Sequence, residues 1–281
     1  MTAGCEHGVG SHDGTEPSMA SAPEASRAWL LIEHPGPWPP EPAEAELPAP
    51  LHAVAVAAAG LGIRVQLIRS PAPRTEPGPR TEPGPRMEPA PRTEPAPRTE
   101  PGARRVFVGW TAGSQPWLRH GEVGSRAPHQ THQTHWPHRT PPPSWPPGLD
   151  LDRLAVGDPP SFGSPVGEPV FLVCGHGQRN ACCARFGVPL ARQLATRYPG
   201  QVFQTTHVGG HRFAANLVIL PHGLYYGPVG IAEATAAISA YQRGEVTPER
   251  YRGRAGQPRS AQQEEHDVLT RAGSLAVAAL A

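Results

Sequence analysis

Residues that bind soft metals gather in two short segments of the second half of the chain. Residues 174–183 read CGHGQRNACC and contain three of the four cysteines. Residues 207–211 read HVGGH. Thiolates and neutral imidazoles are the ligands that zinc and iron–sulfur clusters of mixed ligation select. Together the two segments predict a metal site built from cysteine and histidine.

The spacing of His207 and His211 favours a loop over a helix. Gly209 and Gly210 lie between them, and glycine is costly in a helix interior. No glutamate follows His207, so the general base of an HExxH zinc protease is missing. A glycine loop lets both imidazoles face one ligand, although two ordinary histidines beside a turn give the same pattern.

The residues alone leave the choice of cysteines open. Cys174 ends the apolar run EPVFLVC, which is typical of a buried strand, and it therefore faces the loop that follows. Cys182 and Cys183 are adjacent, so at most one of them points into a shared site. A Rieske-type site needs the pattern C-x-H twice, and the chain has it once, at His176. We interpret His176 as a supporting residue, not a ligand.

Apolar runs predict the elements that position these segments. In the second half we expect strands at 168–174, 201–206, 212–220 and 224–227, and helices at 181–198, 229–241 and 260–279. Asn180 caps the first of these helices and Pro189 interrupts it. The order β-α-β followed by β-β-α is the thioredoxin-like arrangement. In the first half we expect strands at 28–33, 63–69 and 105–110 and a helix at 48–60, which make a small α/β unit.

Proline-rich stretches suggest the domain boundaries. Residues 74–103 repeat the hexapeptide RTEPGP almost perfectly, and their prolines block helix and sheet pairing. Residues 121–165 are rich in proline and histidine. We expect a small α/β N-terminal domain at 1–120 interrupted by the repeat, a linker at 121–165, a thioredoxin-like domain at 166–242, and a C-terminal extension with a terminal helix at 243–281. The predicted fold class is α/β, with long disordered insertions.

Composition excludes several classes of function. The formal net charge is +1 and no basic run is interleaved with aromatic residues, so we expect no nucleic-acid partner. No apolar run approaches the roughly 20 residues of a bilayer span, and the N-terminus lacks a signal-peptide pattern. We therefore expect a soluble, cytoplasmic protein with no membrane partner. Four cysteines in such a chain indicate metal binding or redox chemistry more than a disulfide framework.

Longer stretches of the chain resemble the sucrase/ferredoxin-like family, which includes thioredoxin-like [2Fe-2S] ferredoxins. The resemblance lies in FLVCGHGQRNACCARFG, THVGGHRFAANLVILPHGLYYGPV, WLLIEHPGPW and YRGRAGQP. It implies a [2Fe-2S] cluster held by two cysteines and two histidines. By position these are Cys174, Cys183, His207 and His211, because the family's nine-residue spacing favours Cys183 over Cys182. The chain departs from the family pattern at Asn180, where an aspartate is common.

The resemblance implies a soluble one-electron carrier with a pH-dependent potential and an unidentified redox partner protein. Sucrase activity is not expected, because glycoside hydrolysis needs two facing carboxylates and residues 170–228 contain no Asp or Glu. Ligand types alone leave a structural Cys2His2 zinc site as an alternative. A thiol–disulfide oxidoreductase is a further alternative, although the chain lacks the usual C-x-x-C.

Overall fold

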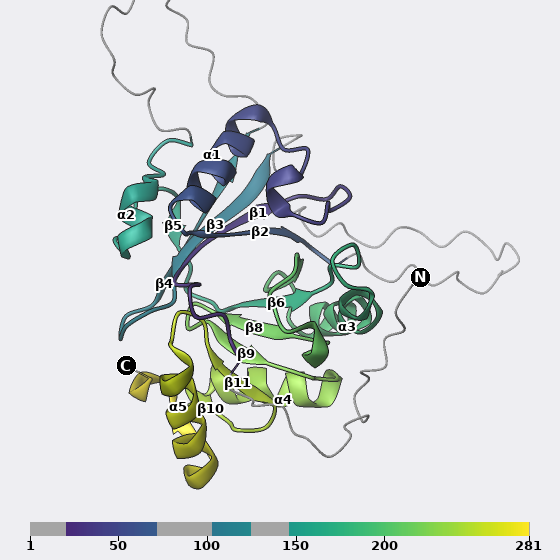
Figure 1. Cartoon of the computed structure of the whole chain (residues 1–281), viewed down its shortest axis with the longest axis vertical. Helices are drawn as coiled ribbons and strands as arrows, with labels where there is room; N and C mark the ends of the chain where they lie inside the picture. Colours follow the sequence, from purple (N-terminus) through teal and green to yellow (C-terminus); the bar gives the residue numbers. More distant parts are fainter. Residues whose placement is uncertain (1–20, 72–102, 125–145, 281) are drawn as a thin grey trace, which may run out of the picture.

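A computed structural model describes residues 21–71, 103–124 and 146–280 of the chain. Most of the proline-rich repeat, the histidine-rich segment 129–138 and Cys5 lie outside these residues, so the predicted insertions stay predictions. The described part is a mixed α/β structure dominated by one large curled β-sheet, with helices on its outer side (Figure 1). No helix within these ranges is long and apolar enough to cross a membrane.

The large sheet contains ten of the described strands, in the order β11-β9-β8-β6-β7-β2-β1-β3-β4-β5. Its strands are β1 (Ala28–Glu33), β2 (Arg64–Arg69), β3 (Arg104–Trp110), β4 (Trp117–Val123), β5 (Ser164–Pro165), β6 (Val170–Cys174), β7 (Val202–Thr205), β8 (Leu217–Leu220), β9 (Leu224–Tyr226) and β11 (Tyr251–Arg254). A small second sheet pairs β10 (Glu245–Val246) with β12 (Leu275–Ala276). The helices are α1 (Ala49–Gly60), α2 (Leu151–Val156), α3 (Val188–Arg197), α4 (Ile231–Gln242) and α5 (Arg259–Ala272).

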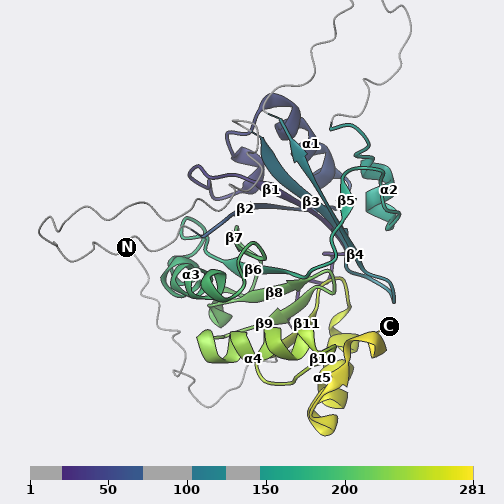
Figure 2. The ribbon, with the colours of Figure 1, turned by 180° about the vertical axis from the view of Figure 1, so that it is seen from behind.

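The same strand arrangement occurs twice in the large sheet. In the first half, β1 pairs in parallel with β2 and antiparallel with β3, which pairs antiparallel with β4. In the second half, β6 pairs in the same way with β7 and β8, and β8 with β9. The halves meet where β2 and β7 run antiparallel, and Figure 2 shows β7 between β2 and β6. Strands of both predicted domains thus join one sheet, while the predicted boundaries themselves stay untested.

Successive side chains along each strand point to opposite faces of the sheet, and this separates one inner core from two outer cores. In β1, Leu30 and Ile32 pack with α1, whereas Trp29 and Leu31 face the inner side of the curled sheet. In β6, Phe171 and Val173 pack with α3 in the same manner. The inner core contains Trp29, Leu31, Ile68, Phe107, Leu118, Val170, Leu172, Cys174, Cys183, Phe203, Val208, Val218, Leu220 and Tyr225. Both cysteines of interest therefore lie in the inner core.

The structure divides the helix predicted at 181–198. Asn180 caps its start as expected, because the Asn180 side chain accepts a hydrogen bond of 2.9 Å from the backbone N–H of Cys182. Ala181 and Cys182 are α-helical, the residues Cys183–Gly187 form a π-helical turn, and regular α-helix resumes at Val188. Pro189 explains the division, because it lacks the N–H that an α-helix needs and its ring crowds the preceding turn.

Other elements differ from the prediction for local reasons. The strand predicted at 212–220 begins only at Leu217, after a 3-10 turn at His211–Phe213. The terminal helix ends at Ala272, because Gly273 adopts the left-handed conformation that terminates helices. The predicted linker 121–165 contains α2 and β5, while β4, β10 and β11 were missed.

His222, in the turn between β8 and β9, should make the stability of the fold pH-dependent. Its Nδ1 lies 2.5 Å from the Tyr241 hydroxyl, and burial followed by the charge of Arg254 lowers its pKa to about 4. An unfolded chain binds this proton near pH 6.5, so stability falls as the pH drops from about 7 to about 4. Because His222 is partly exposed, we expect its share of the loss to be about 2 kcal/mol. Urea denaturation at both ends of this range should show a correspondingly smaller loss for His222→Gln. Equal losses in both proteins would contradict this prediction.

Candidate metal site

Cys174, Cys183 and His207 come together where β6 and β7 end. Their ligand atoms all lie within 4.8 Å of one another, and among the described residues they form the group of metal-binding side chains close enough to share one ion. The Nδ1 atom of His207 lies 3.9 Å from the Cys174 sulfur and 3.7 Å from the Cys183 sulfur. This arrangement can hold a metal through two sulfurs and one imidazole.

A close backbone approach places Cys183 beside Cys174. Gly187, at the end of the π-helical turn, packs against the carbonyl oxygen of Cys174, and a Cβ at this glycine would lie 1.8 Å from that oxygen. Only glycine permits this contact, because no other residue lacks a Cβ. The turn can therefore lie directly on the end of β6. Both sulfur-bearing residues are fully buried there.

A hydrogen bond joins the side chains of Cys174 and Cys183. A hydrogen bond from Cys183 holds the pKa of Cys174 well below its ordinary value, against the opposing effect of burial, and His207 and two backbone N–H groups add to this. The same hydrogen bond, together with burial, raises the pKa of Cys183. The hydrogen bond thus favours the thiolate form at Cys174, with the Cys183 thiol as its donor. Thiolate is the form that binds a metal, and the remaining proton leaves when a metal binds.

The fourth predicted ligand lies next to this group. His211 is exposed on the same glycine loop, and the centroid of its ring is 6.3 Å from that of His207. It is not within the three-residue group, and neither is Cys182. The structure therefore brings together three of the four predicted residues and leaves His211 beside them.

A buried arginine supports the loop from behind, and sequence reasoning gave it no such role. Arg252 is fully buried and donates a hydrogen bond to the side-chain oxygen of Asn216. Asn216 in turn donates to the carbonyl of Gly210 over 3.1 Å. Gly210 has a φ of 63°, and a Cβ there would lie 2.2 Å from the guanidinium of Arg252. The guanidinium also lies 4.2 Å from the centre of the Phe213 ring. This chain of contacts fixes the backbone between the two histidines.

His176 supports the other end of the loop. It is buried, and its Nδ1 accepts the backbone N–H of His207 over 3.1 Å. Its Nε2 therefore carries the proton and donates to the carbonyl of Pro39 over 2.9 Å. Burial lowers its pKa, which keeps the ring neutral near pH 7. His176 thus holds the backbone of His207 in place, as the interpretation of a supporting residue expects.

Removing this support should weaken metal binding. His176→Phe keeps a ring but leaves the N–H of His207 without its acceptor, so the ligand loses its fixed position. We expect the affinity for Co²⁺, measured by competition with a chelator, to fall about 10- to 100-fold. His52→Phe on the exposed side of α1 is the matched control and should bind Co²⁺ as the wild type does. Equal affinities in the two variants would show that His176 plays no part in holding the site.

A comparison with known protein families covers most of the chain. A family model described as sucrase/ferredoxin-like matches residues 20–253, which include both halves of the sheet and the whole metal site. The chain belongs to the sucrase/ferredoxin-like family. Sequence similarity to individual family members is more limited, and no solved structure matches the chain.

Two of the relatives carry the name Altered inheritance of mitochondria protein 32. The protein of Meyerozyma guilliermondii is 28% identical over 99 residues, which cover 31% of this chain and 35% of that protein. The protein of Debaryomyces hansenii is 29% identical over 104 residues, which cover 31% and 36% of the two chains. The matched part thus spans about a third of each relative, so these relatives give no whole-protein function to this chain.

Proposed function

We propose that the chain is a one-electron carrier in which Cys174, Cys183, His207 and His211 hold a [2Fe-2S] cluster. The observation that carries the proposal is the close group of two sulfurs and one imidazole in a member of this family. The second imidazole lies on the same loop. A redox partner protein would then exchange electrons with the exposed side of this loop, and a cytoplasmic location remains part of the proposal.

The residues present fit such a cluster. Thiolates and imidazoles are its ligands in mixed-ligand sites, and the hydrogen bond from Cys183 holds the pKa of Cys174 well below its ordinary value. When bound, the cluster supplies a one-electron centre, for which two-histidine ligation in Rieske centres gives potentials of about −150 to +300 mV. The ring of His211 is exposed to solvent beside the site. A proton taken up on reduction makes the potential fall as the pH rises.

The topology of the second half supports a thioredoxin-like unit. Its elements follow the order β6-α3-β7-β8-β9-α4, and its strands lie in the order β9-β8-β6-β7. The site then occupies the end of the first strand of the unit. The first half has the same strand order, and its residues 21–71 and 103–124 contain no cysteine. Buried Cys174 and Cys183 sulfurs make a thiol–disulfide oxidoreductase a poor fit, because exchange needs an accessible thiolate.

A structural zinc site is the alternative that three close ligands also support. Anaerobic purification followed by iron, acid-labile sulfide and zinc analysis separates the two. We expect a red-brown protein that contains iron and sulfide in equal amounts, and a potential that falls with rising pH. Stoichiometric zinc without sulfide would overturn the proposal, and a potential that is flat between about pH 6 and pH 10 would overturn its proton-coupled part.

A further inference from the structure

The first half of the chain reaches the metal site through β2. Strands β2 and β7 run antiparallel with Ile68 opposite Thr205, so the start of β2 lies beside the residues that follow β7. This register brings Arg64, the first residue of β2, next to the candidate ligand His207. A side chain of the first half therefore contacts the backbone of the glycine loop.

Several contacts hold the partly buried guanidinium of Arg64 in place. Its Nη2 donates to the carbonyl of His207 over 3.2 Å, and its Nη1 donates to the Ser26 hydroxyl over 2.8 Å. The buried amide of Gln66, oriented so that its oxygen faces a donor, accepts from Arg64 Nε over 3.1 Å. The guanidinium carbon lies 5.3 Å from the centre of the fully buried Trp29 ring. The rigid, planar fork of arginine suits contacts in several fixed directions.

The contact with Arg64 completes the support of the His207 backbone. The N–H of His207 donates to His176 over 3.1 Å, and its carbonyl accepts from Arg64. The carbonyl of the next residue, Val208, accepts from the buried Tyr225 hydroxyl over 3.3 Å. The backbone of this ligand is thus fixed on both sides, by one side chain from each half of the chain.

The positive charge of Arg64 has no carboxylate beside it. Arginines of the described residues form several ion pairs, and Arg64 takes part in none of them. Its partners are a carbonyl, a hydroxyl, an amide and an aromatic ring, which leave its full formal charge in place. Burial raises the pKa of Tyr225, the charge of Arg64 opposes this effect and the charge of Cys174 adds to it. The charges of Arg64 and Cys174 therefore both act on this one hydroxyl.

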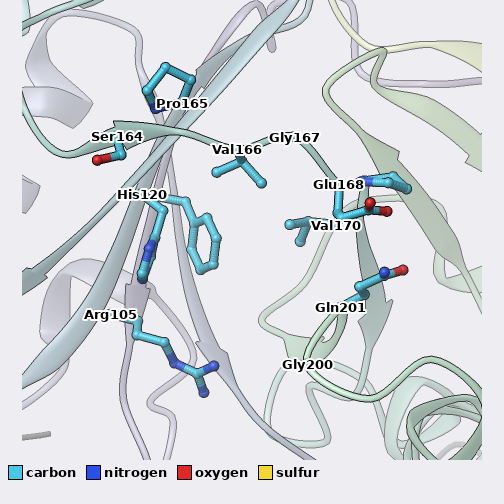
Figure 3. A pocket seen from close by; sticks show the side chains of 12 residues that line it. Arg105, His120, Ser164, Pro165, Val166, Gly167, Glu168, Val170, Gly200 and Gln201 are labelled. Carbon is cyan, nitrogen blue, oxygen red and sulfur yellow. The ribbon is translucent and has the colours of Figure 1, made fainter. Parts of the chain in front are cut away.

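The corresponding strand end of the first half shows the opposite charge balance. Glu33 ends β1 and lies opposite Ile68 of β2. Cys174 ends β6 and lies opposite Thr205 of β7 in the same way. Arg105 lines a cavity of about 350 Å³ between β3, β4 and the starts of β6 and β7 (Figure 3), and it donates to the two oxygens of Glu33 over 2.7 and 3.0 Å. The arginine next to Glu33 is thus neutralised, whereas the arginine next to the metal site keeps its charge.

We propose that Arg64 is a positioning residue of the metal site, which holds His207 in place and favours the reduced form of the site through its charge. The second part rests on the proposed function. Two thiolates and two neutral imidazoles balance the formal charge of an oxidised [2Fe-2S] core, so reduction adds one negative charge. A fixed positive charge nearby stabilises that added charge. A zinc site with the same ligands stays neutral, and Arg64 then has the positioning role alone.

Arg64→Met tests the positioning role, because methionine keeps an unbranched apolar stem and loses the donors to His207. We expect the affinity of the metal-free protein for Co²⁺ to fall about tenfold or more, and the absorption spectrum of the bound Co²⁺ to change with the ligand geometry. Arg119→Met on β4 is the matched control, since Arg119 also donates to two backbone carbonyls, those of Phe162 and Gly163. It should leave the Co²⁺ affinity and spectrum unchanged.

Redox titration of the iron-containing protein tests the effect of the charge. For Arg64→Met, the ratio of reduced to oxidised protein at a fixed potential should fall at least about threefold. Arg64→Lys keeps the positive charge and should hold this ratio within about twofold of the wild type. Arg119→Met removes a charge from the far part of the sheet, and solvent ions screen charges at such separations, so the ratio should stay unchanged.

Each part of the proposal has its own contradicting result. Equal Co²⁺ affinity and spectrum in Arg64→Met and the wild type would overturn the positioning role. An unchanged potential in Arg64→Met, or one equally lowered in Arg64→Lys, would overturn the effect of the charge. If Arg64→Met fails to fold, Arg64→Gln replaces it in both experiments, because its shorter side chain does not reach the carbonyl of His207. Stoichiometric zinc without sulfide would overturn the proposed function and the charge effect, while the Co²⁺ comparison would still decide the positioning role.

Discussion

Replacing Cys183 with serine is expected to abolish the metal centre, whereas Cys182→Ser leaves it in place. The sulfur of Cys183 belongs to the three-residue group with ligand atoms within 4.8 Å, and the sulfur of Cys182 does not. A serine oxygen is a hard, protonated donor that neither zinc nor an iron–sulfur cluster prefers. Loss of a supporting residue costs about 10- to 100-fold in metal affinity, so loss of a direct ligand should cost more than about 100-fold.

The measurement is metal and sulfide content after anaerobic purification, together with Co²⁺ affinity of the metal-free protein. Cys183→Ser should lack iron, sulfide and visible colour, and Cys182→Ser should keep all three. Both variants are compared by circular dichroism to show that each is folded. A coloured, iron-containing Cys183→Ser protein would remove this residue from the site. Loss of the metal in Cys182→Ser alone would exchange the roles of the two neighbours.

The candidate metal-binding residues could be picked out from the sequence because their chemistry is local. Cysteines and histidines separated by glycines indicate a soft-metal site whatever the surrounding fold is, and the apolar run that ends at Cys174 indicates a buried strand. The choice between Cys182 and Cys183 depends on how the turn packs, and the residues could not decide it. In the structure Cys183 belongs to the three-residue group and Cys182 is disulfide-bonded, while the missing Cβ of Gly187 lets the turn lie on the carbonyl of Cys174. A glycine in a helical pattern gives no sign of such a contact.

For a similar reason, the sequence does not predict how the two halves of the sheet pair with each other. Strand runs such as WLLIE and FLVC predict buried strands, but they do not state which strand pairs with which. The pairing of Ile68 with Thr205 spans 137 residues and includes a long segment outside the described structure. Only this register shows that Glu33 and Cys174 occupy corresponding places.

Arg252→Met is expected to lower the free energy of unfolding by about 3 kcal/mol and to weaken metal binding more than about tenfold. Arg252 donates hydrogen bonds to Asn216, to the carbonyl of Ser21 over 2.9 Å and to the Ser21 hydroxyl over 2.9 Å. Methionine fills similar space but leaves the Asn216 oxygen buried without its donor. Asn216 then no longer has a fixed position from which to hold the carbonyl of Gly210. The two histidines on either side of that glycine lose their common orientation.

A second variant separates this positioning role from a general loss of stability. Leu269→Ala removes a fully buried side chain from the outer core of the second half and should cost about 2–5 kcal/mol. It should leave the affinity for Co²⁺ unchanged in the folded protein, because Leu269 belongs to an outer core, whereas Cys174, Cys183 and Val208 belong to the inner core. Arg243→Met, at the exposed end of α4, should change neither quantity by more than about 0.5 kcal/mol. If Arg252→Met and Leu269→Ala weaken Co²⁺ binding equally, then Arg252 acts on the fold as a whole and does not orient the histidine loop.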